Sequence, residues 1–430
     1  MSKLVDDQQA AGPACRRVIF VESAAAMGGV QFSTLYLAQS LEKGLWQPVV
    51  VCPEEGDLTR ACRDSGIETR VLDYPRLWST SVRVRGARLP NPAAWAWDAG
   101  VIVSATRRLE HLLIQCSADL VVTKGLSSHF LGGLVARRLR IPCVWHVQDF
   151  ISERSFGIYR RAFGLAARWL PDQIIVDGKT IAGQLPRSLQ SRTTVIHNGV
   201  DTNIFRPNLD GTKLRSELGI PPDHLVVGHM GRITPWKGQH YLIEAFARIA
   251  NRHPAVTLLL VGAPVFDNGS YQRRLLAMVA QFGLSERIKF AGYRHDTAQV
   301  LAAMDLFAFT SIEKDTSPLA LLSAMSCGLP IVAFDIAGVR ELMTGEQCSL
   351  VPVGQVRALV DSLEALINDE ALRQRLALKA REVVMSGLSL EQYKSRMERE
   401  FLKVSSHGQS ENIEYVGAGL PKIQRETFES

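Results

Sequence analysis

Short apolar runs alternate with helix-like stretches along most of this chain, and this alternation restricts the possible fold more than any other feature of the sequence. Strands that are apolar on both faces belong to parallel sheets covered by helices on both sides. Two successive series of such runs therefore predict an α/β protein with two doubly wound, Rossmann-like domains. The predicted strands are Val18–Val21, Val49–Val51, Leu120–Val122, Cys143–Trp145, Ile174–Val176 and Thr194–Ile196 in the first series, then Leu225–Val227, Thr257–Val261, Ile288–Phe290, Leu306–Phe309 and Ile331–Phe334 in the second.

The boundary between the two domains is predicted in the stretch from Val200 to Asp210, which is rich in Asn, Pro and Asp. A chain of 430 residues is also too long for one ordinary core. We assign residues 1–204 to an N-terminal domain and residues 205–388 to a C-terminal domain. Residues 389–404 have a helical apolar period, and Ser389 with Gln392 forms a capping box at their start. Residues 405–430 are polar and aperiodic, which predicts a disordered tail.

Composition restricts the cellular setting. Apolar residues make up 46% of the chain, but no apolar run reaches the roughly 18 residues of a membrane span. The polar N-terminus lacks the plan of a secretory signal. Seven scattered cysteines without a Cys-x-x-Cys pair favour reduced, mostly buried thiols over a disulfide framework or a zinc site. We therefore expect a cytoplasmic protein.

Positive charge is concentrated in the first half of the chain. Residues 1–200 carry 24 Lys and Arg against 17 Asp and Glu, whereas residues 201–430 carry 25 against 26. This excess fits an acidic partner, such as a lipid phosphate, an anionic membrane surface or a nucleic acid; an ordinary solvated surface is the alternative. No RNP-like basic and aromatic strand and no zinc finger occurs, so nucleic acid is the least supported partner.

The segment from Pro75 to Trp97 differs from its surroundings, because it combines several arginines with three tryptophans and has little periodicity. Arg and Trp together suit a membrane–water interface. The same residues also suit an aromatic or sugar acceptor bound by stacking. An ordinary surface loop with inward-folded tryptophans is the third interpretation.

The loop from Gly231 to Gly238 lies between a predicted strand and a predicted helix and contains Arg232 and Lys237. A strand, a glycine-bracketed loop and a helix place backbone N–H groups and a helix N-terminus against a phosphate. Two cations beside a helix dipole suit a diphosphate leaving group. The loop is neither a P-loop nor the dinucleotide fingerprint. A basic surface loop without function is the alternative interpretation.

Three other candidate positions follow predicted strands. Gly28 and Gly29 precede a helix, where glycines permit close approach of a ligand and the helix N-terminus favours an anion. His146 ends a strand, and a buried, hydrogen-bonded histidine is the alternative there. Asp315 precedes a helix and can accept sugar hydroxyls or simply cap that helix. Because the carboxyl ends of parallel strands share one edge, the two domains are expected to face each other across a cleft.

Some motifs are absent from the sequence. No Asp-x-Asp occurs, so the usual carboxylate clamp for a metal–diphosphate is missing. Charge on a leaving diphosphate would then be balanced by Arg232, Lys237 and helix dipoles, and we expect no metal and no cofactor. No Ser-His-Asp, His-Glu-x-x-His or EF-hand pattern is found.

Together these motifs resemble the retaining glycosyltransferase family 4, which has the GT-B architecture. The resemblance extends from about Val18 to Lys403. The motifs that carry it are Gly28-Gly29, His146 before Asp149, Asn198-Gly199-Val200-Asp201 with Phe205 and Pro207, Gly231-Arg232 with Lys237-Gly238, and Glu313-x-Asp315 through Ala324-Met325-Ser326-Cys327-Gly328-Leu329-Pro330.

The resemblance implies a role for each matched position. Arg232 and Lys237 match the pair that holds the donor's diphosphate, in the loop that opens at Gly231. His146 matches a histidine near the transferred sugar, and Gly28 with Gly29 matches the loop that closes over donor and acceptor. The remaining implied donor contacts are Asp315 as the first acid of the family's Glu-x7-Glu element, the backbone of Thr316, Ser317, Pro318 and Leu319 around sugar and phosphate, and Tyr293 and Arg294 near the nucleotide base.

One position departs from the family pattern. Ser323 stands where the family has the second acid of Glu-x7-Glu, which holds the ribose hydroxyls. Loss of charge-assisted hydrogen bonds costs about 1.5–3 kcal/mol, or roughly ten- to a hundredfold in donor affinity. The chain is then an active enzyme with a compensating contact, an enzyme with an altered donor, or a protein that binds without turnover.

The resemblance implies transfer of a sugar from a nucleotide diphosphate-sugar to a hydroxyl of a glycan or lipid-linked glycan, with retention of anomeric configuration. The N-terminal domain would bind the acceptor, and the helix at 389–404 would cross back to that domain. The excess of basic residues in the N-terminal domain suggests peripheral association with the inner face of the cell membrane. A binding-only protein of polysaccharide assembly is the alternative; an epimerase of the same architecture is supported by fold alone.

Overall fold

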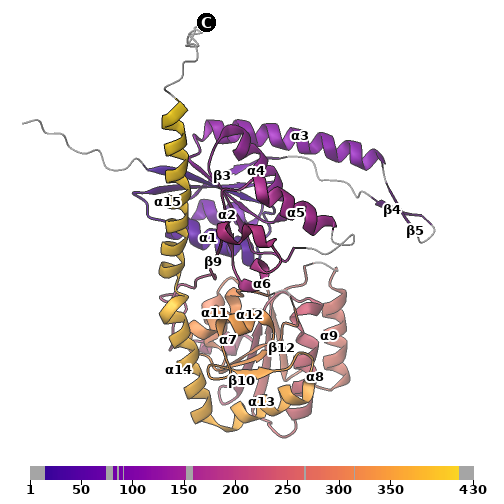
Figure 1. Ribbon diagram of the computed structural model, residues 1–430. Coiled ribbons are helices and arrows are strands. Elements are labelled where there is room, and N and C mark those ends of the chain that lie inside the picture. Colours follow the sequence, from indigo (N-terminus) through magenta and orange to yellow (C-terminus); the bar gives the residue numbers. More distant parts are fainter. Residues whose placement is uncertain are drawn as a thin grey trace, which may run out of the picture.

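The computed structural model describes residues 15–73, 81–84, 87–90, 92–151, 158–265, 268–313 and 315–415. Within these residues, two parallel sheets are each covered by helices on both faces (Figure 1). The prediction of two doubly wound α/β domains is confirmed. All the strands predicted from apolar runs are present, because a run that is apolar on both faces is stable only when both faces are buried.

The N-terminal sheet has the order β3-β2-β1-β6-β7-β8-β9, and all its neighbouring strands are parallel. The chain winds outward from β1 in one direction and from β6 in the other, so the switch point lies between these two strands. The strands are β1 (Arg16–Glu22), β2 (Trp46–Cys52), β3 (Glu68–Val71), β6 (Leu120–Lys124), β7 (Cys143–Val147), β8 (Gln173–Val176) and β9 (Thr193–Val195). An antiparallel hairpin of β4 (Ser81–Val84) and β5 (Ala87–Pro90) stands apart.

Two helical layers cover the N-terminal sheet. Leu109 of α3, Val135 of α4 and Phe163 of α5 pack in one hydrophobic cluster. Leu37 of α1 and Leu58 of α2 pack in a second cluster on the opposite face. The helices are α1 (Gly29–Ser40), α2 (Asp57–Asp64), α3 (Pro92–Gln115), α4 (Leu126–Leu139), α5 (Ile158–Trp169), α6 (Lys179–Ala182) and the 3₁₀ helix η1 (Arg187–Arg192).

The C-terminal sheet repeats this plan with the order β12-β11-β10-β13-β14-β15. Its switch point lies between β10 and β13. The strands are β10 (Leu225–Met230), β11 (Val256–Val261), β12 (Ile288–Gly292), β13 (Leu306–Phe309), β14 (Ile331–Phe334) and β15 (Ser349–Val351). The helices are α7 (Thr212–Glu217), η2 (Pro235–Lys237), α8 (Gln239–Ile249), α9 (Ser270–Gln281), α10 (Thr297–Ala302), α11 (Leu319–Ser326), α12 (Ala337–Leu342), α13 (Val356–Asn368) and α14 (Glu370–Gly387).

The last helix, α15 (Leu390–Tyr415), runs from the C-terminal domain along the N-terminal one (Figure 1). Its Phe401 ring packs edge-on against Trp46 and Phe20, with ring centroids 5.7 Å and 6.4 Å apart. Where it begins, the backbone N–H of Leu390 donates to Val200 O at 2.8 Å. The two segments that connect the domains therefore lie side by side.

The predicted disordered tail from residue 405 is wrong in its first part, because α15 continues to Tyr415. Val404 and Ser405 are still buried, and a helix that has already formed extends at little cost per residue. Residues 416–430 lie outside the described residues. The side chains of the segment from Pro75 to Trp97 also lie outside them, so the three interpretations of that segment stay predictions.

Two further features bear on the cellular setting. Among the described residues, no helix combines the length and apolar character needed to cross a bilayer. All seven cysteines are free thiols, and all except Cys15 are buried.

Candidate active site

The carboxyl edges of the two sheets meet, and side chains from both domains form hydrogen bonds there. The Thr316 hydroxyl, after β13, donates to Asp177 Oδ1, after β8, at 2.7 Å. The backbone N–H of Asn198 donates to Ser317 Oγ at 2.8 Å, and Asn198 Nδ2 donates to Ser317 O at 2.9 Å. The junction thus joins the loop expected to hold a donor to the edge expected to hold an acceptor.

Lys237 is held in place by the turn that follows it. Gly238 has φ +67°, and a Cβ there would lie 2.1 Å from Thr310 O, so the position requires glycine. Thr310 Oγ1 donates to Lys237 O at 2.9 Å. These contacts direct the Lys237 ammonium toward Asp315, with Nζ to Oδ1 and Oδ2 distances of 2.8 Å and 2.7 Å. The ammonium also lies 5.7 Å from the centre of the Phe309 ring.

The Lys237–Asp315 ion pair is nearly buried, because the side chains are 11% and 15% exposed. An ammonium has three N–H bonds, and Asp315 accepts two of them, so a third remains for another acceptor. The sequence predicted Asp315 as a hydrogen-bond partner of sugar hydroxyls. In the structure its two oxygens position the lysine instead, which the sequence analysis did not anticipate.

Arg232 lies in the same loop and is exposed. Its carbonyl oxygen accepts a 2.8 Å hydrogen bond from Gln239 Nε2, which fixes the backbone. Its guanidinium acts on Asp149 of the other domain: burial raises the pKa of that carboxyl, and the Arg232 charge lowers it. Arg232 therefore faces the N-terminal domain close to the segment that follows His146.

His146 is the penultimate residue of β7 and is fully buried. Neither of its ring nitrogens has a hydrogen-bond partner among the described residues. Burial, followed by the charges of Lys124 and His129, lowers its pKa well below the usual value, so the imidazole is neutral. The interpretation of His146 as a buried histidine is correct in this conformation, although the expected hydrogen bond is not formed.

Sheet register places a second set of polar groups beside His146. Lys124 is the register partner of His146 on one side and of Glu22 on the other. The buried Lys124 Nζ donates to Ser33 Oγ at 2.7 Å, and the buried Glu22 accepts from Thr34. Burial lowers the pKa of Lys124 and raises that of Glu22, while their mutual attraction opposes both shifts. This pair was not predicted from the sequence, although a charged residue directly after an apolar strand was the available signal.

The glycine pair lies at the start of α1. Gly28 is the N-cap residue with extended backbone, and a Cβ on Gly29 would meet no atom within 4 Å. Further along α1, burial raises the pKa of Tyr36 to about 12, and Tyr293 of the other domain adds to this effect. Tyr293 is 48% exposed. The charge of Tyr293 therefore acts on Tyr36 across the junction of the two domains.

The remaining predicted donor contacts lie at two places in the C-terminal domain: Arg294, shortly after β12, and residues at the start of and within α11. Arg294 forms ion pairs within its own domain, at 2.5 Å to Glu217 and 2.7 Å to Asp296, so its charge is already balanced. Pro318 is the N-cap residue of α11, and Leu319 is its first residue. Ser323 is buried inside this helix at 5% exposure.

A contact that the sequence did not indicate joins the domains at α6. Glu341 on α12 accepts hydrogen bonds from Lys179 N at 2.5 Å, Thr180 N at 2.9 Å and Thr180 Oγ1 at 2.6 Å. One carboxylate of the C-terminal domain therefore caps the first turn of a helix in the N-terminal domain. Its charge strengthens these bonds relative to those of a neutral acceptor.

Comparison with protein families follows the domain division. Residues 27–204 match the family described as Glycosyltransferase Family 4, and residues 210–383 match Glycosyl transferases group 1. Two similar proteins are the D-inositol 3-phosphate glycosyltransferase of Stackebrandtia nassauensis, 32% identical over 203 residues, and the lipopolysaccharide core biosynthesis mannosyltransferase LpsB of Rhizobium meliloti, 30% identical over 199 residues. The first alignment covers 46% of this chain and 45% of the relative; the second covers 46% and 56%. The chain thus spans about half the length of these relatives.

Solved structures show the same fold. The Anabaena protein HepE in complex with UDP-glucose superposes with a TM-score of 0.76 at 24% identity, over 90% of this chain and 99% of that one. WaaG, a glycosyltransferase involved in lipopolysaccharide biosynthesis, gives 0.65 at 16% identity, over 88% and 98%. At these identities the likeness establishes the fold alone. Both are consistent with two facing Rossmann-like domains.

Proposed function

Because the chain belongs to glycosyltransferase family 4, we propose that it transfers a sugar from a nucleotide diphosphate-sugar to a hydroxyl of a glycan or lipid-linked glycan intermediate, with retention of anomeric configuration. The observation that carries this proposal is the Lys237–Asp315 pair with Arg232 in the same loop, at the meeting edges of the two domains. Both cations belong to one strand–loop–helix unit, and Asp315 holds the Lys237 ammonium in place.

The donor diphosphate is assigned to this loop. The third N–H of the Lys237 ammonium and the Arg232 guanidinium supply positive charge, and a desolvated ammonium acts more strongly on a phosphate oxygen than one in water. The N-terminus of α11 adds free N–H groups. Binding of UDP-glucose by HepE, which shares the fold, supports a nucleotide-sugar as the donor.

The proposed reaction is a single displacement in which the acceptor attacks the same face of the sugar from which the diphosphate departs. The bond between the anomeric carbon and the leaving phosphate oxygen breaks, and a bond to the acceptor oxygen forms. The acceptor hydroxyl gives its proton to the leaving phosphate. Positioning and electrostatic stabilisation carry most of the rate, because charge develops on the diphosphate beside Lys237 and Arg232. We propose that these side chains take the place of a metal ion, since the sequence has no Asp-x-Asp.

His146 is assigned to the sugar side of the junction. Because its side chain is fully buried in the present arrangement, contact with a sugar requires movement that uncovers the end of β7. Its two nitrogens without partners make it the polar group most in need of a ligand at this edge. The neutral imidazole would donate or accept a hydrogen bond, not carry charge.

Ser323 favours a second candidate, a protein that binds nucleotide sugars without turnover and acts in polysaccharide assembly. The buried hydroxyl cannot provide the two charge-assisted bonds that a carboxylate gives to ribose. The two candidates differ in one observable. The enzyme releases nucleoside diphosphate, and the binding-only protein does not.

The experiment is an assay of nucleoside diphosphate release by hydrolysis, with water in place of the acceptor, from a panel of UDP-, GDP- and ADP-sugars, alongside thermal shift with the same ligands. Release from one donor, lost in the variant Lys237→Met/Asp315→Asn, is the expected result. A thermal shift without release supports the binding-only protein. Neither shift nor release across the panel would overturn both candidates.

We also propose that the protein works in the cytoplasm, at the inner face of the cell membrane. The positive excess of residues 1–200 supports an anionic surface as its site of action. A lipid-linked acceptor would be presented at such a surface.

A further inference from the structure

The outer surface of the layer formed by α3, α4 and α5 combines exposed apolar side chains with arginines. We call it the α3–α5 face. Its exposed large apolar side chains are Ile102, Val103, Ile114, Leu134, Leu165 and Trp169. Its exposed basic side chains include Arg107, Arg108, Arg137, Arg138, Arg161 and Arg168. The inner side of the same helices packs on the sheet, so this surface is the side turned away from the core.

Negative charge is nearly missing from this face. Among the described side chains of the three helices, Glu110 is the one carboxylate, and it lies 3.5 Å from Arg138. Some exposed arginines elsewhere on the molecule are paired with acids, as Arg60 is with Asp57 and Arg63 with Glu55. The face therefore presents a strongly positive field beside apolar side chains.

The apolar and basic residues are interleaved on α5. Arg161, Leu165, Arg168 and Trp169 recur at the spacing of one helix face. Leu165 is 65% exposed and Trp169 is 61% exposed. The Arg168 guanidinium lies 5.9 Å from the centre of the Trp169 ring. Tryptophan and arginine with an exposed leucine suit the boundary between water and hydrocarbon.

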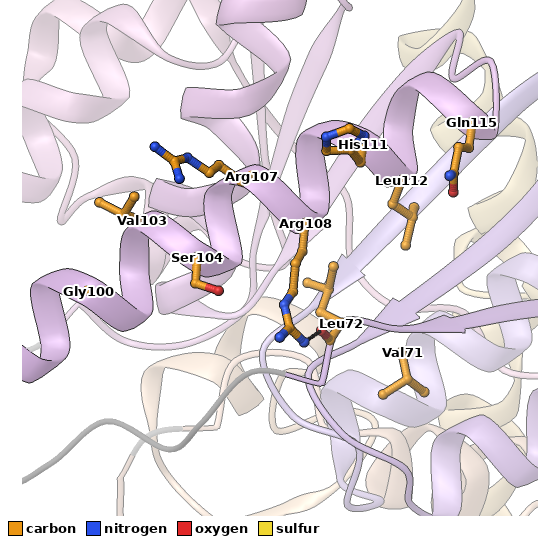
Figure 2. A pocket seen from close by; sticks show the side chains of 10 residues that line it. All are labelled: Val71, Leu72, Gly100, Val103, Ser104, Arg107, Arg108, His111, Leu112 and Gln115. Carbon is orange, nitrogen blue, oxygen red and sulfur yellow. Dashed lines mark hydrogen bonds between the residues drawn. The ribbon is translucent and has the colours of Figure 1, made fainter.

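The basic surface continues along α3 to the edge of the sheet. A groove of about 610 Å³ lies between this helix and β3 and is lined by Arg107, Arg108 and His111 (Figure 2). Arg108 extends from α3 toward Leu72, to whose carbonyl oxygen its Nη1 donates at 3.1 Å, whereas Arg107 extends away from that contact (Figure 2). Anionic headgroups can therefore contact basic side chains in this groove as well as those beside the exposed apolar side chains.

We propose that the α3–α5 face docks on an anionic lipid bilayer. Leu165 and Trp169 enter the headgroup region, and the arginines bind lipid phosphates. This proposal rests on the proposed transfer to a lipid-linked acceptor and deepens it, because it names the surface that meets the membrane. A second copy of the chain would bring two positive faces together, and a nucleic acid would leave the exposed Leu165 unexplained.

The test is co-sedimentation with vesicles of phosphatidylcholine alone and of equimolar phosphatidylcholine and phosphatidylglycerol. Each basic residue near such a surface contributes about fivefold, so Arg161→Gln/Arg168→Gln should weaken binding to the anionic vesicles by about 25-fold. Leu165→Gln/Trp169→Gln should abolish most of the remaining partition. Matched controls lie on α9 of the other domain and at Phe282, its C-cap residue, as Arg273→Gln/Arg274→Gln and Leu276→Gln/Phe282→Gln, and should bind like the wild type.

Several outcomes would overturn the docking proposal: equal binding to both vesicle types, face variants that bind like the wild type, controls that lose as much as the face variants, or a wild-type dimer that the face variants dissociate. Tighter binding to single-stranded DNA than to anionic vesicles would also overturn it. Nucleoside diphosphate release measured without vesicles distinguishes failure of the proposed function from failure of the docking proposal. If release is absent but the vesicle pattern holds, the proposed function fails and the docking face stands.

Discussion

Replacing Lys237 by methionine separates the structural and the chemical contributions of this residue. The Nζ atom lies 2.7–2.8 Å from both Asp315 oxygens, in a pair whose side chains are 11% and 15% exposed. Loss of one partner of a nearly buried ion pair leaves an uncompensated charge and costs about 3–5 kcal/mol. Lys237→Met should therefore lower the free energy of unfolding by that amount, a large fraction of the total for an ordinary domain.

The double variant Lys237→Met/Asp315→Asn removes both charges. It should recover most of the lost stability, because the remaining buried groups are neutral. It should not recover activity, because the cation proposed to face the leaving diphosphate is still missing. Loss of one such electrostatic contact costs about 2.7–4 kcal/mol of transition-state stabilisation, or roughly 10²- to 10³-fold in kcat.

Urea unfolding and nucleoside diphosphate release are measured on the same protein samples. Lys289→Met is the matched control, because Lys289 pairs with the almost fully exposed Glu286 at 3.8 Å. It should change stability by no more than about 1 kcal/mol and leave kcat unchanged. A double variant that keeps wild-type kcat, or a Lys237→Met protein as stable as the Lys289 control, would rule out these roles for Lys237.

Three further predictions concern the junction. Burial raises the pKa of Asp177 to about 7, well above that of an unfolded aspartate. The free energy of unfolding should therefore fall as the pH rises from about 4 to about 7, by up to roughly 1.4 kcal/mol per pH unit. Asp177→Asn, which keeps an acceptor for Thr316, should flatten that slope in urea unfolding at pH 5 and pH 8; an unchanged slope argues against it. Glu341→Gln loses charge-assisted bonds to the first turn of α6, so small-angle scattering should show a larger radius of gyration. An unchanged radius would argue against a role of Glu341 in holding the two domains together. Ser323→Glu should lower the melting temperature of the free protein and tighten nucleotide binding about tenfold; unchanged affinity would place the ribose elsewhere.

The sheets could be predicted from the sequence because their strands are buried on both faces. The pattern missed β3 and β15, which lie at sheet edges. The β3 sequence, Glu68–Val71, is mostly polar, and β15 has three residues. Short edge strands need not be apolar, so nothing in their composition distinguishes them from loops. The end of α15 was missed for a related reason, since a helix can extend beyond its apolar period.

The site also has one part that could be predicted from the sequence and one part that could not. The placement of Arg232 and Lys237 on one loop at a sheet edge followed from local sequence. The partner of Lys237 did not, because Asp315 is 78 positions away and only the fold brings it near. The burial of His146 and the pairing of Lys124 with Glu22 depend on sheet register and on what covers the strand ends. Local pattern carries no information about either.

We propose above all that Arg232 and Lys237 hold the diphosphate of a nucleotide-sugar at the junction of the two domains. Titration calorimetry with a nucleoside diphosphate and its monophosphate tests this claim most directly, in the wild type and in Arg232→Gln. The wild type should prefer the diphosphate by about tenfold or more, and Arg232→Gln should lose most of that preference. Equal affinity for the two nucleotides in the wild type, or a preference that survives Arg232→Gln, would contradict the claim.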